Sequence, residues 1–421
     1  MIIVSYTTSA NMFNSSSTFK EIKGIRKEKI WQLFRATDFE SLMYPCFTFS
    51  RFLGIHPYKI NASIIKTCKF CYILSTIIIC AFCVFEVLIL YDINVTDNIL
   101  FKNIPRKLER NCFYIFGGFI TIVTFIQSGP RMRLLQTILQ LSLILPPKSY
   151  QNLSRLIHAK DIFGFFFLIM QGWMYFPKVQ FGILRQIFAI YISLLVFEVD
   201  MLYMNCVCVL KACFKQINDN LANLQKIMAK REPYVLKETH QRNLLLLIKL
   251  NAVKKQHMII SDTVQMLKIV FNLQLFSTMI ITFTQIIFNL YYYLMQIQVG
   301  INVQKIEFYY GYLIAVIIYY FTKVLLMVWS CETGKNQAAE IITTVHEVLN
   351  SASDKQIKYE LQLFSLQLMH YRNIFSAKGL TVNATFFTAM MGSITMYLLI
   401  LVQFLLMFNI CAGKSRINVM I

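Results

Sequence analysis

The sequence predicts an all-α polytopic membrane protein with seven transmembrane helices. Of its 421 residues, 57% are hydrophobic and only 15% are charged, and the mean hydropathy is +0.54. A soluble chain carries about a quarter charged residues. Tyrosines gather at the ends of the apolar segments, as they do at membrane interfaces. No basic region precedes a long apolar run at the N-terminus, so a cleaved signal peptide is not expected.

Seven apolar segments have the length that a helix needs to cross a bilayer. The third is the shortest and ends near Pro177. An earlier stretch, 41–58, is apolar but interrupted by Pro45, Gly54 and Pro57, so we expect it to be a re-entrant or interfacial segment. The predicted transmembrane helices are 70–91, 112–129, 161–180, 184–208, 265–295, 308–331 and 382–408.

The basic residues orient the predicted helices. Lys and Arg residues on the N-terminal side of the membrane outnumber those on the other side by roughly three to one. This bias indicates a cytosolic N-terminus and, after seven spans, an extracellular C-terminus, opposite to a G-protein-coupled receptor. The sequon Asn94-Val95-Thr96 falls in the first outside loop, which makes Asn94 a glycosylation candidate. The net charge of +20 lies in these loops without a nucleic-acid motif, so nucleic acid is not an expected partner.

The segments between the spans complete the predicted organisation. Residues 1–69 form a cytosolic N-terminal region, and residues 70–331 hold the first six spans. Within them, 206–264 continue spans four and five as amphipathic cytosolic helices. Residues 335–380 are a predicted cytosolic anchor helix, whose apolar stripe needs a packing partner. After the last span, residues 409–421 form a predicted extracellular tail.

Charged side chains inside the predicted spans are functional candidates, because a charge in a bilayer is costly. Glu198 and Asp200 lie in the inner half of span four, where they can pair with Lys268 or Lys323 or take part in gating or ligand sensing. Glu86 lies toward the outer end of span one, and we expect it to reach the interface. Two C-x-x-C strings occur, but no second pair with histidines accompanies them, so neither a metal site nor a cofactor is expected.

The last predicted span carries a glutamine deep inside it. Gln403 is costly there if it faces lipid, so it faces protein or water. Ile400, Gln403, Phe404 and Met407 share one helix face. A polar side chain beside bulky apolar ones fits a narrow, gated water path. The alternative is that Gln403 hydrogen-bonds a neighbouring helix.

The string around this glutamine resembles a family signature. Tyr397, five aliphatic residues, Gln403 and Phe404 resemble the terminal signature of insect gustatory receptors, although Met396 stands at the usual threonine position. Thr381 also replaces the usual phenylalanine. Further strings similar to that family are GIHPY at 54–58, CE at 331–332 and FSAKGL at 375–380.

This resemblance implies a homo- or heterotetramer with other gustatory receptors in the plasma membrane of sensory neurons. Each subunit gives its last span to one cation pore, with Ile400, Gln403 and Phe404 near the gate, and the cytosolic helices form a shared anchor. The implied function is a non-selective cation channel, not an enzyme, that is gated by a small-molecule tastant. Membrane lipid and permeant cations are its other partners.

The residue at position 398 bears on which class of ligand the protein is expected to bind. Sugar-sensing members of that family tend to have an acidic residue after the tyrosine of the signature, whereas Leu398 follows Tyr397 here. This difference favours a bitter or host-plant compound. A sugar-gated member of the family and a seven-span receptor or transporter without its own pore remain the alternatives.

A ligand has to bind among the spans, because the predicted outside loops are short. Rings and amides converge in the outer halves of spans two to six, a mixture that suits a neutral, moderately polar organic molecule. The ligand-binding candidates are Tyr114, Gln171, Trp173, Tyr175, Gln186, Tyr191, Gln285, Asn289, Tyr292, Tyr309 and Tyr312.

Overall fold

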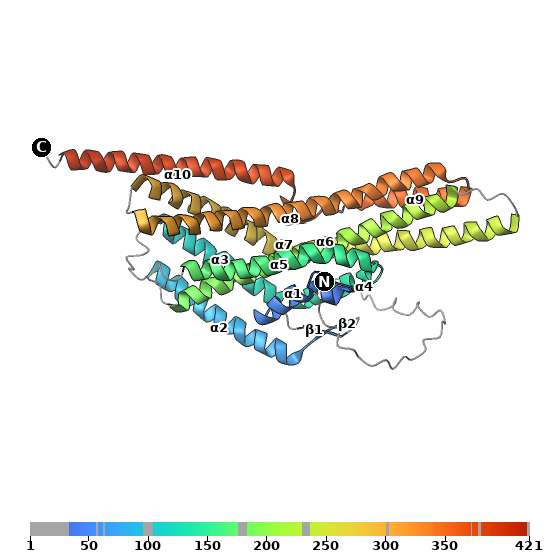
Figure 1. The fold of residues 1–421 in the computed structure, drawn as a ribbon, viewed down its shortest axis with the longest axis horizontal. Coiled ribbons are helices and arrows are strands. Elements are labelled where there is room, and N and C mark those ends of the chain that lie inside the picture. The colour runs from blue at the N-terminus through green and yellow to red at the C-terminus, as the bar shows by residue number, and fades with distance from the viewer. Residues whose placement is uncertain are drawn as a thin grey trace, which may run out of the picture.

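The described part of the chain folds into long helices that run side by side along one axis (Figure 1). The computed structural model describes residues 33–55, 58–61, 64–95, 104–175, 183–229, 236–299, 303–371, 373–377 and 380–418. The helices are α1 (Phe39–Phe52), α2 (Lys69–Asn94), α3 (Ile104–Ile126), α4 (Ser128–Ser142), α5 (Pro147–Tyr175), α6 (Ile183–Ala229), α7 (Leu236–Val299), α8 (Val303–Ser351), α9 (Lys355–His370) and α10 (Ala384–Asn418). Two antiparallel hairpins are formed by β1 (Tyr58–Asn61) with β2 (Ile64–Thr67) and by β3 (Ser376–Ala377) with β4 (Leu380–Thr381).

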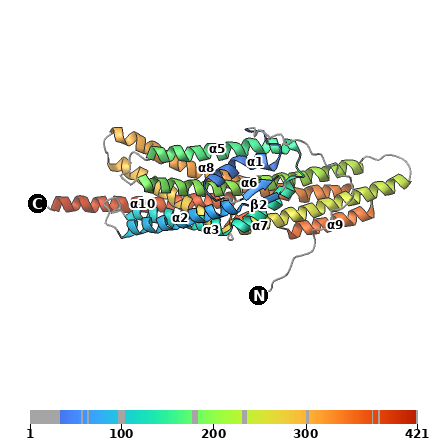
Figure 2. The ribbon, with the colours of Figure 1, turned by 90° about the horizontal axis from the view of Figure 1, so that it is seen from below.

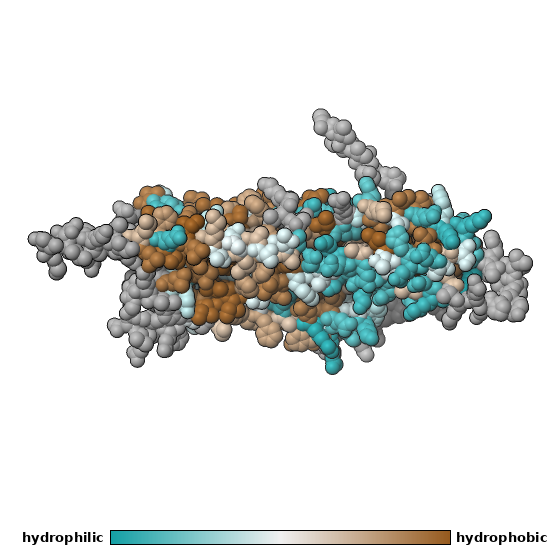
Figure 3. Space-filling view, turned by 90° about the horizontal axis from the view of Figure 1, so that it is seen from above, coloured by the Kyte–Doolittle hydropathy of each residue, from teal (hydrophilic) through white to brown (hydrophobic). Residues whose placement is uncertain are grey.

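The two ends of this elongated molecule differ in surface character. Figure 3 shows apolar residues concentrated toward one end and polar residues toward the other. The apolar end holds α2, α3 and α10, and the polar end holds α9 (Figures 1 and 2). α6, α7 and α8 run through both parts. We call their portions in the polar part, together with α9, the helical extensions.

The predicted fold class is confirmed, since the described residues are nearly all helical and every predicted span lies largely within one helix. Five described helices are long and apolar enough to cross a membrane, namely α2, α6, α7, α8 and α10. α3 and α4, which meet at an angle of 66°, form a sixth if they are taken as one broken span. α5 holds the predicted third span but does not meet this test, because polar residues fill its first half. The membrane orientation remains a prediction.

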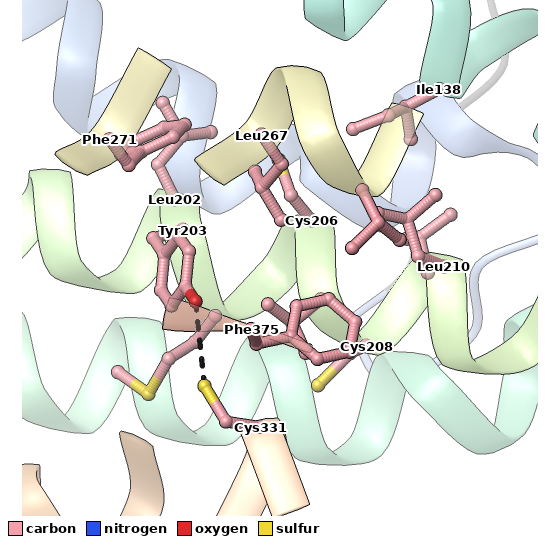
Figure 4. Packing of buried hydrophobic residues seen from close by; sticks show 14 of the residues in the cluster. Ile138, Leu202, Tyr203, Cys206, Cys208, Leu210, Leu267, Phe271, Cys331 and Phe375 are labelled. Carbon is pink, nitrogen blue, oxygen red and sulfur yellow. Dashed lines mark hydrogen bonds between the residues drawn. The ribbon is translucent and has the colours of Figure 1, made fainter. Parts of the chain in front are cut away.

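The core is centred on α6, which packs against α1, α3, α4, α5, α7 and α8. Figure 4 shows the middle of α6 between the other helices, with Tyr203 beside Cys331 of α8 and Cys206 beside Leu267 of α7. The Tyr203 hydroxyl lies 3.5 Å from the Cys331 sulfur, and both side chains are buried. Burial on all sides explains why the central part of α6 is largely apolar, with Glu198, Asp200 and Asn205 as its buried polar residues.

α1 shows why the segment expected to be interrupted by Pro45 is a regular helix. Asp38 and Ser41 form a capping box that starts it. Pro45 has no N–H, so it leaves the carbonyl of Ser41 without its usual helical partner. His158 of α5 supplies one: its Nε2 lies 3.2 Å from that carbonyl oxygen, while its Nδ1 accepts the N–H of Phe34. At 14 residues, α1 is too short to span a bilayer.

The predicted anchor helix 335–380 is divided in the structure. α8 continues to Ser351, and α9 begins anew at Lys355. The division has a local cause, because the Asp354 carboxylate accepts the N–H groups of Gln356 and Ile357 at 2.8 and 3.0 Å and so caps a new helix. The β3–β4 hairpin then leads into α10. That last helix continues to Asn418, so most of the segment expected to be a tail is helical.

Candidate functional site

α10 has one face that packs on other helices of the same chain. The Asn383 side chain caps its start by accepting the N–H of Phe386 at 2.8 Å. Met390 and Ile394 are buried, and Leu401 packs against the core. Ring contacts fix the same face, with Phe387 lying 5.5 Å from Phe321 of α8 and Tyr397 lying 5.9 Å from Phe283 of α7 between centroids. α10 is therefore held by α7 and α8.

The predicted pore residues lie away from this packed face. Gln403 follows Ile394 by nine residues, which is two and a half helical turns and places it on the opposite side. Its side chain is exposed and makes no hydrogen bond to any described residue. Phe404 is 67% exposed, and Ile400 is half-buried. The described part of the subunit therefore does not supply the interhelical hydrogen bond that was the alternative role of Gln403.

Six of the predicted ligand-binding residues are buried in the apolar part of the molecule. Asn289 and Gln285 lie one turn apart on α7, and the Asn289 amide donates to the Gln285 side-chain oxygen at 3.2 Å. The Arg106 guanidinium lies 5.5 Å from the centre of the Tyr292 ring. The buried candidates are Tyr114, Gln171, Gln186, Gln285, Asn289 and Tyr292. Tyr312 is half-buried beside Tyr292.

The remaining candidates are not gathered with that set. Trp173 is 74% exposed on the outside of α5. Tyr191 points toward α1, where its hydroxyl donates to the Leu53 carbonyl at 2.9 Å. The side chains of Tyr175 and Tyr309 lie outside the described residues.

Several residues that the sequence did not single out line the same region. Phe288, Tyr291 and Leu313 form a buried cluster with Tyr292, and Leu398 of α10 packs on it. This cluster connects the candidate ligand region with α10. Leu398 and Leu401 fall on the packed face of α10 by the same helical spacing that places Gln403 opposite, so the sequence periodicity contained the signal.

Glu198 and Asp200 of α6 point in different directions and belong to two separate polar networks. Asp200 pairs with Lys323 of α8 at 2.9 Å and accepts a hydrogen bond from Thr278 of α7. Glu198 faces the other way and accepts from Ser50 of α1 at 2.9 Å. Lys268 is exposed, so of the two lysines expected as partners only Lys323 pairs with Asp200. The ion pair and the hydrogen bond from Thr278 together connect α6, α7 and α8.

Two further predictions concern α2. Glu86 does not reach an interface, because its side chain turns inward against Gly118 of α3 and is only 8% exposed. Asn94, the glycosylation candidate, is exposed at the end of α2 and exchanges two amide hydrogen bonds with Asn111 of α3. Thr96 of the sequon lies outside the described residues. No group of His, Cys, Asp and Glu residues in the described part could hold a metal ion.

The described structure is a nearly all-helical fold with several helices of membrane-spanning length, the class of polytopic membrane proteins. The family model described as "7tm Chemosensory receptor" matches residues 43–408, and the chain belongs to this family. It is 32% identical over 144 residues to "Putative gustatory receptor 28b" of Drosophila melanogaster, covering 32% of this chain and 29% of that protein. It is 27% identical over 155 residues to "Putative gustatory receptor 28a" of the same organism, covering 36% and 34%. These matches span about a third of each relative.

Solved structures agree with the fold. The insect olfactory receptor OR5 from Machilis hrabei superimposes with a TM-score of 0.66 at 12% identity, over 86% of this chain and 97% of that one. The same receptor in complex with eugenol gives a TM-score of 0.62 at 13% identity over the same shares. At this identity the likeness shows a shared fold. The predicted family is thus confirmed: the chain belongs to the chemosensory receptor family, and the two curated relatives named above are gustatory receptors.

Proposed function

We propose that this chain is a subunit of a tastant-gated, non-selective cation channel in the plasma membrane of sensory neurons. The observation that carries the proposal is the two-sided character of α10. Only 11% of its most apolar window is buried, and its uncovered face presents a glutamine without a partner among the described residues. A polar side chain in that place needs water or another subunit beside it. Four copies around an axis provide both.

Assembly around an axis also accounts for the outer face of α9. Its inner face is buried against α7 and α8. Its outer face leaves Tyr359, Leu366 and Met369 exposed by 59%, 63% and 65%. Apolar groups exposed at this level in the polar part of a protein mark a contact surface. We assign this face, with the helical extensions, to contacts between subunits of a homo- or heterotetramer.

The ligand region of the proposal is the buried set formed by Tyr114, Gln171, Gln186, Gln285, Asn289 and Tyr292. Its rings and amides offer stacking surfaces and a few hydrogen-bonding groups, the mixture that small organic molecules require. The structural neighbour with eugenol is a complex with a small molecule of this kind. Leu398 after Tyr397 favours a bitter or host-plant compound as the ligand.

The proposal has a direct test. The chain is expressed alone in a cell line that has no other insect receptors, and a panel of bitter, host-plant and sugar compounds is applied during calcium imaging and whole-cell recording. We expect a current that needs both the chain and a bitter or host-plant compound. A response to sugars alone transfers the assignment to the sugar-sensing class. Surface-expressed protein without current to any compound contradicts the channel.

Orientation is tested separately with epitope tags. The charge bias predicts that a C-terminal tag stains intact cells and that an N-terminal tag stains only permeabilised ones. The reverse pattern contradicts the proposed orientation and with it the placement of the helical extensions in the cytosol.

A further inference from the structure

The buried carboxyl group of Glu86 has no partner among the described residues. Its side chain is only 8% exposed, and neither carboxyl oxygen makes a hydrogen bond. It takes part in none of the ion pairs of the described residues, and the basic Arg185 at the outer ends of α2 and α6 is already paired with Asp92 at 2.5 Å. A buried carboxyl group without partners is costly, so its presence here calls for a structural explanation.

The group is built into the seam between α2 and α3. The Glu86 carboxyl lies against the bare backbone of Gly118, because a Cβ placed on that glycine would stand 2.9 Å from Oε1. Any larger residue at position 118 displaces the carboxyl. A glycine in a helix interior costs stability, but here it leaves the space that the Glu86 carboxyl occupies. We call this place of the carboxyl against Gly118 the seat of Glu86.

Aromatic rings stand on both sides of this seat. Phe82 is one turn before Glu86 on α2, and Tyr114 is one turn before Gly118 on α3. Both rings stack on Phe188 of α6, with centroids 4.9 and 6.2 Å away. The three rings belong to three helices and form one continuous group, which begins one helical turn from Glu86 on α2 and one turn from Gly118 on α3.

An anionic oxygen beside aromatic faces is the combination that recognises an organic ammonium group. The carboxylate accepts the N–H of the ammonium, and the ring faces attract its positive charge. The resulting pair is neutral overall, which suits a membrane interior better than either ion alone. A divalent metal ion is a poorer fit because it needs six or more oxygens, whereas this seat offers two carboxyl oxygens.

The seat is also close to lipid. Phe85 and Val87 flank Glu86 on α2 and are 36% and 67% exposed, and Phe119 next to Gly118 is 41% exposed. These side chains face the bilayer in the apolar part of the molecule. A lipophilic amine can therefore reach the seam from the membrane by displacing one side chain, without entering from the aqueous phase.

We propose that Glu86, seated on Gly118 and bordered by Phe82, Tyr114 and Phe188, is a binding site for lipophilic amines in their ammonium form. This inference goes beyond the proposed function by adding a cation-selective site on the α2 side of Tyr114, and only its effect on current depends on the channel proposal. It separates a charged ligand class from the neutral molecules that suit the amides of α7.

Binding to the purified full-length protein in nanodiscs tests the site directly. The probes are phenethyldimethylamine and isopentylbenzene, which have the same shape but differ in the nitrogen that carries the charge. Equilibrium dialysis of the wild type should show at least about tenfold tighter binding of the amine, the size of a combined ion-pair and cation–π contact. Equal binding of the two probes overturns the site.

Three variants locate the effect. Glu86→Gln keeps the shape of the side chain and should abolish the preference for the amine, while leaving isopentylbenzene binding unchanged. Gly118→Ala keeps the charge but displaces it, and should also reduce the preference. Glu109→Gln is the matched control. Glu109 is an equally buried acid on α3, but it lies two and a half turns before Gly118 and so on the opposite face of the helix, and the variant should retain the preference. Full preference in Glu86→Gln, or its loss in Glu109→Gln alone, overturns the assignment to Glu86.

Whole-cell recording then separates this inference from the proposed function. Amine binding that depends on Glu86, in a protein that passes no current to any tastant, supports the site and contradicts the channel. Current evoked by neutral tastants in a protein without any amine preference supports the channel and contradicts the site.

Discussion

α6 and α10 are both long apolar helices, but α6 is buried among other helices whereas α10 is mostly exposed. In the most apolar window of α6, 72% of the residues are buried inside the subunit, whereas in α10 the share is 11%. The mean hydropathies of these windows are nearly the same, at 1.9 and 1.8. Hydropathy therefore identifies a spanning helix without telling whether protein or something outside the subunit covers it.

The polar residues of the two helices reveal the difference. Glu198 and Asp200 of α6 each find a partner on a neighbouring helix. Gln403 of α10 finds none in the described part of the subunit. A polar group of a spanning helix that is satisfied by its neighbours belongs to the packing of the chain, whereas an exposed one without a partner, such as Gln403, points to water or protein outside the chain.

The largest effect is expected for the α6 ion pair. Asp200→Ala leaves the buried Lys323 ammonium without a counter-charge, at a cost of about 3–5 kcal/mol in unfolding free energy. Fluorescence-detected size exclusion after heating should show a strong loss of folded protein. The double variant Asp200→Leu with Lys323→Met removes both charges and should recover most of the stability. An Asp200→Ala variant as stable as the wild type contradicts the central role of α6.

α9 provides the same contrast within one helix. Leu361→Asp places a charge at a fully buried position of the subunit and should destabilise it by several kcal/mol. Leu363→Asp combined with Leu366→Asp charges the half-buried and exposed outer face, so it should leave folded monomers and remove tetramers. Native mass spectrometry distinguishes these outcomes. Tetramers that persist in the double variant show that the outer face of α9 is not a contact between subunits.

His257 of α7 packs between α6 and α9 in the helical extensions, and its titration should make the stability of the protein depend on pH. It is fully buried, with its ring centre 6.0 Å from that of Phe214 on α6 and 5.7 Å from that of Phe364 on α9. This burial lowers the pKa of His257 to about 4. The unfolded chain, with a pKa of about 6.5, binds the proton first, so acid favours unfolding.

Stability should therefore be complete above about pH 6.5 and fall by up to about 3 kcal/mol as the pH approaches 4. Thermal unfolding of the purified protein across this range measures the loss. His257→Phe keeps an aromatic ring without a titrating group and should reduce the dependence on pH. A slope that is the same in both proteins assigns it to other residues.

The smallest effect on stability, and the most informative one for function, is expected on α10. Phe404→Ala should change the unfolding free energy by less than about 0.5 kcal/mol, because the side chain is mostly exposed in the subunit. It should nevertheless pass current without ligand, since a smaller apolar plug blocks a narrow pore less well.

Gln403→Leu should lower conductance or alter cation preference at normal surface expression, because it removes amide oxygens from the water path. Ile394→Val on the packed face is the control and should leave the current unchanged. Wild-type currents in both the Phe404 and Gln403 variants contradict the assignment of this face to the pore.

Much of the fold can be predicted from the sequence, because a long apolar segment indicates a spanning helix. The positions of the helix ends cannot be predicted in this way. α3 begins at Ile104, eight residues before the predicted span, because Arg106 and Glu109 continue the helix with charged side chains that hydropathy discounts. The sequence alone predicts an interrupted segment at α1, because the hydrogen-bonding partner that replaces the missing N–H of Pro45 is His158, which is far away in the sequence.

The candidate site was less predictable than the fold. Gln285, Asn289 and Tyr292, chosen by residue type, are all buried on one face of α7, and their role in ligand binding stays a prediction. It also selected Trp173, which faces outward, because a sequence does not say which side of a helix meets lipid when both sides are apolar. The seat of Glu86 on Gly118 depends on the pairing of α2 with α3, which no local pattern encodes.

The length of α7 limits how this molecule can move. Its 64 residues extend about 96 Å at a rise of about 1.5 Å per residue, roughly three times the apolar thickness of a bilayer. Because of this length, a tilt of about 5° about the membrane end shifts the far end by about 8 Å, more than a van der Waals contact distance. The packing of Leu361 and Phe364 would be lost in such a swing. Motions that reach α10 must therefore be bends or rotations about the helix axes, which leave the far end in place.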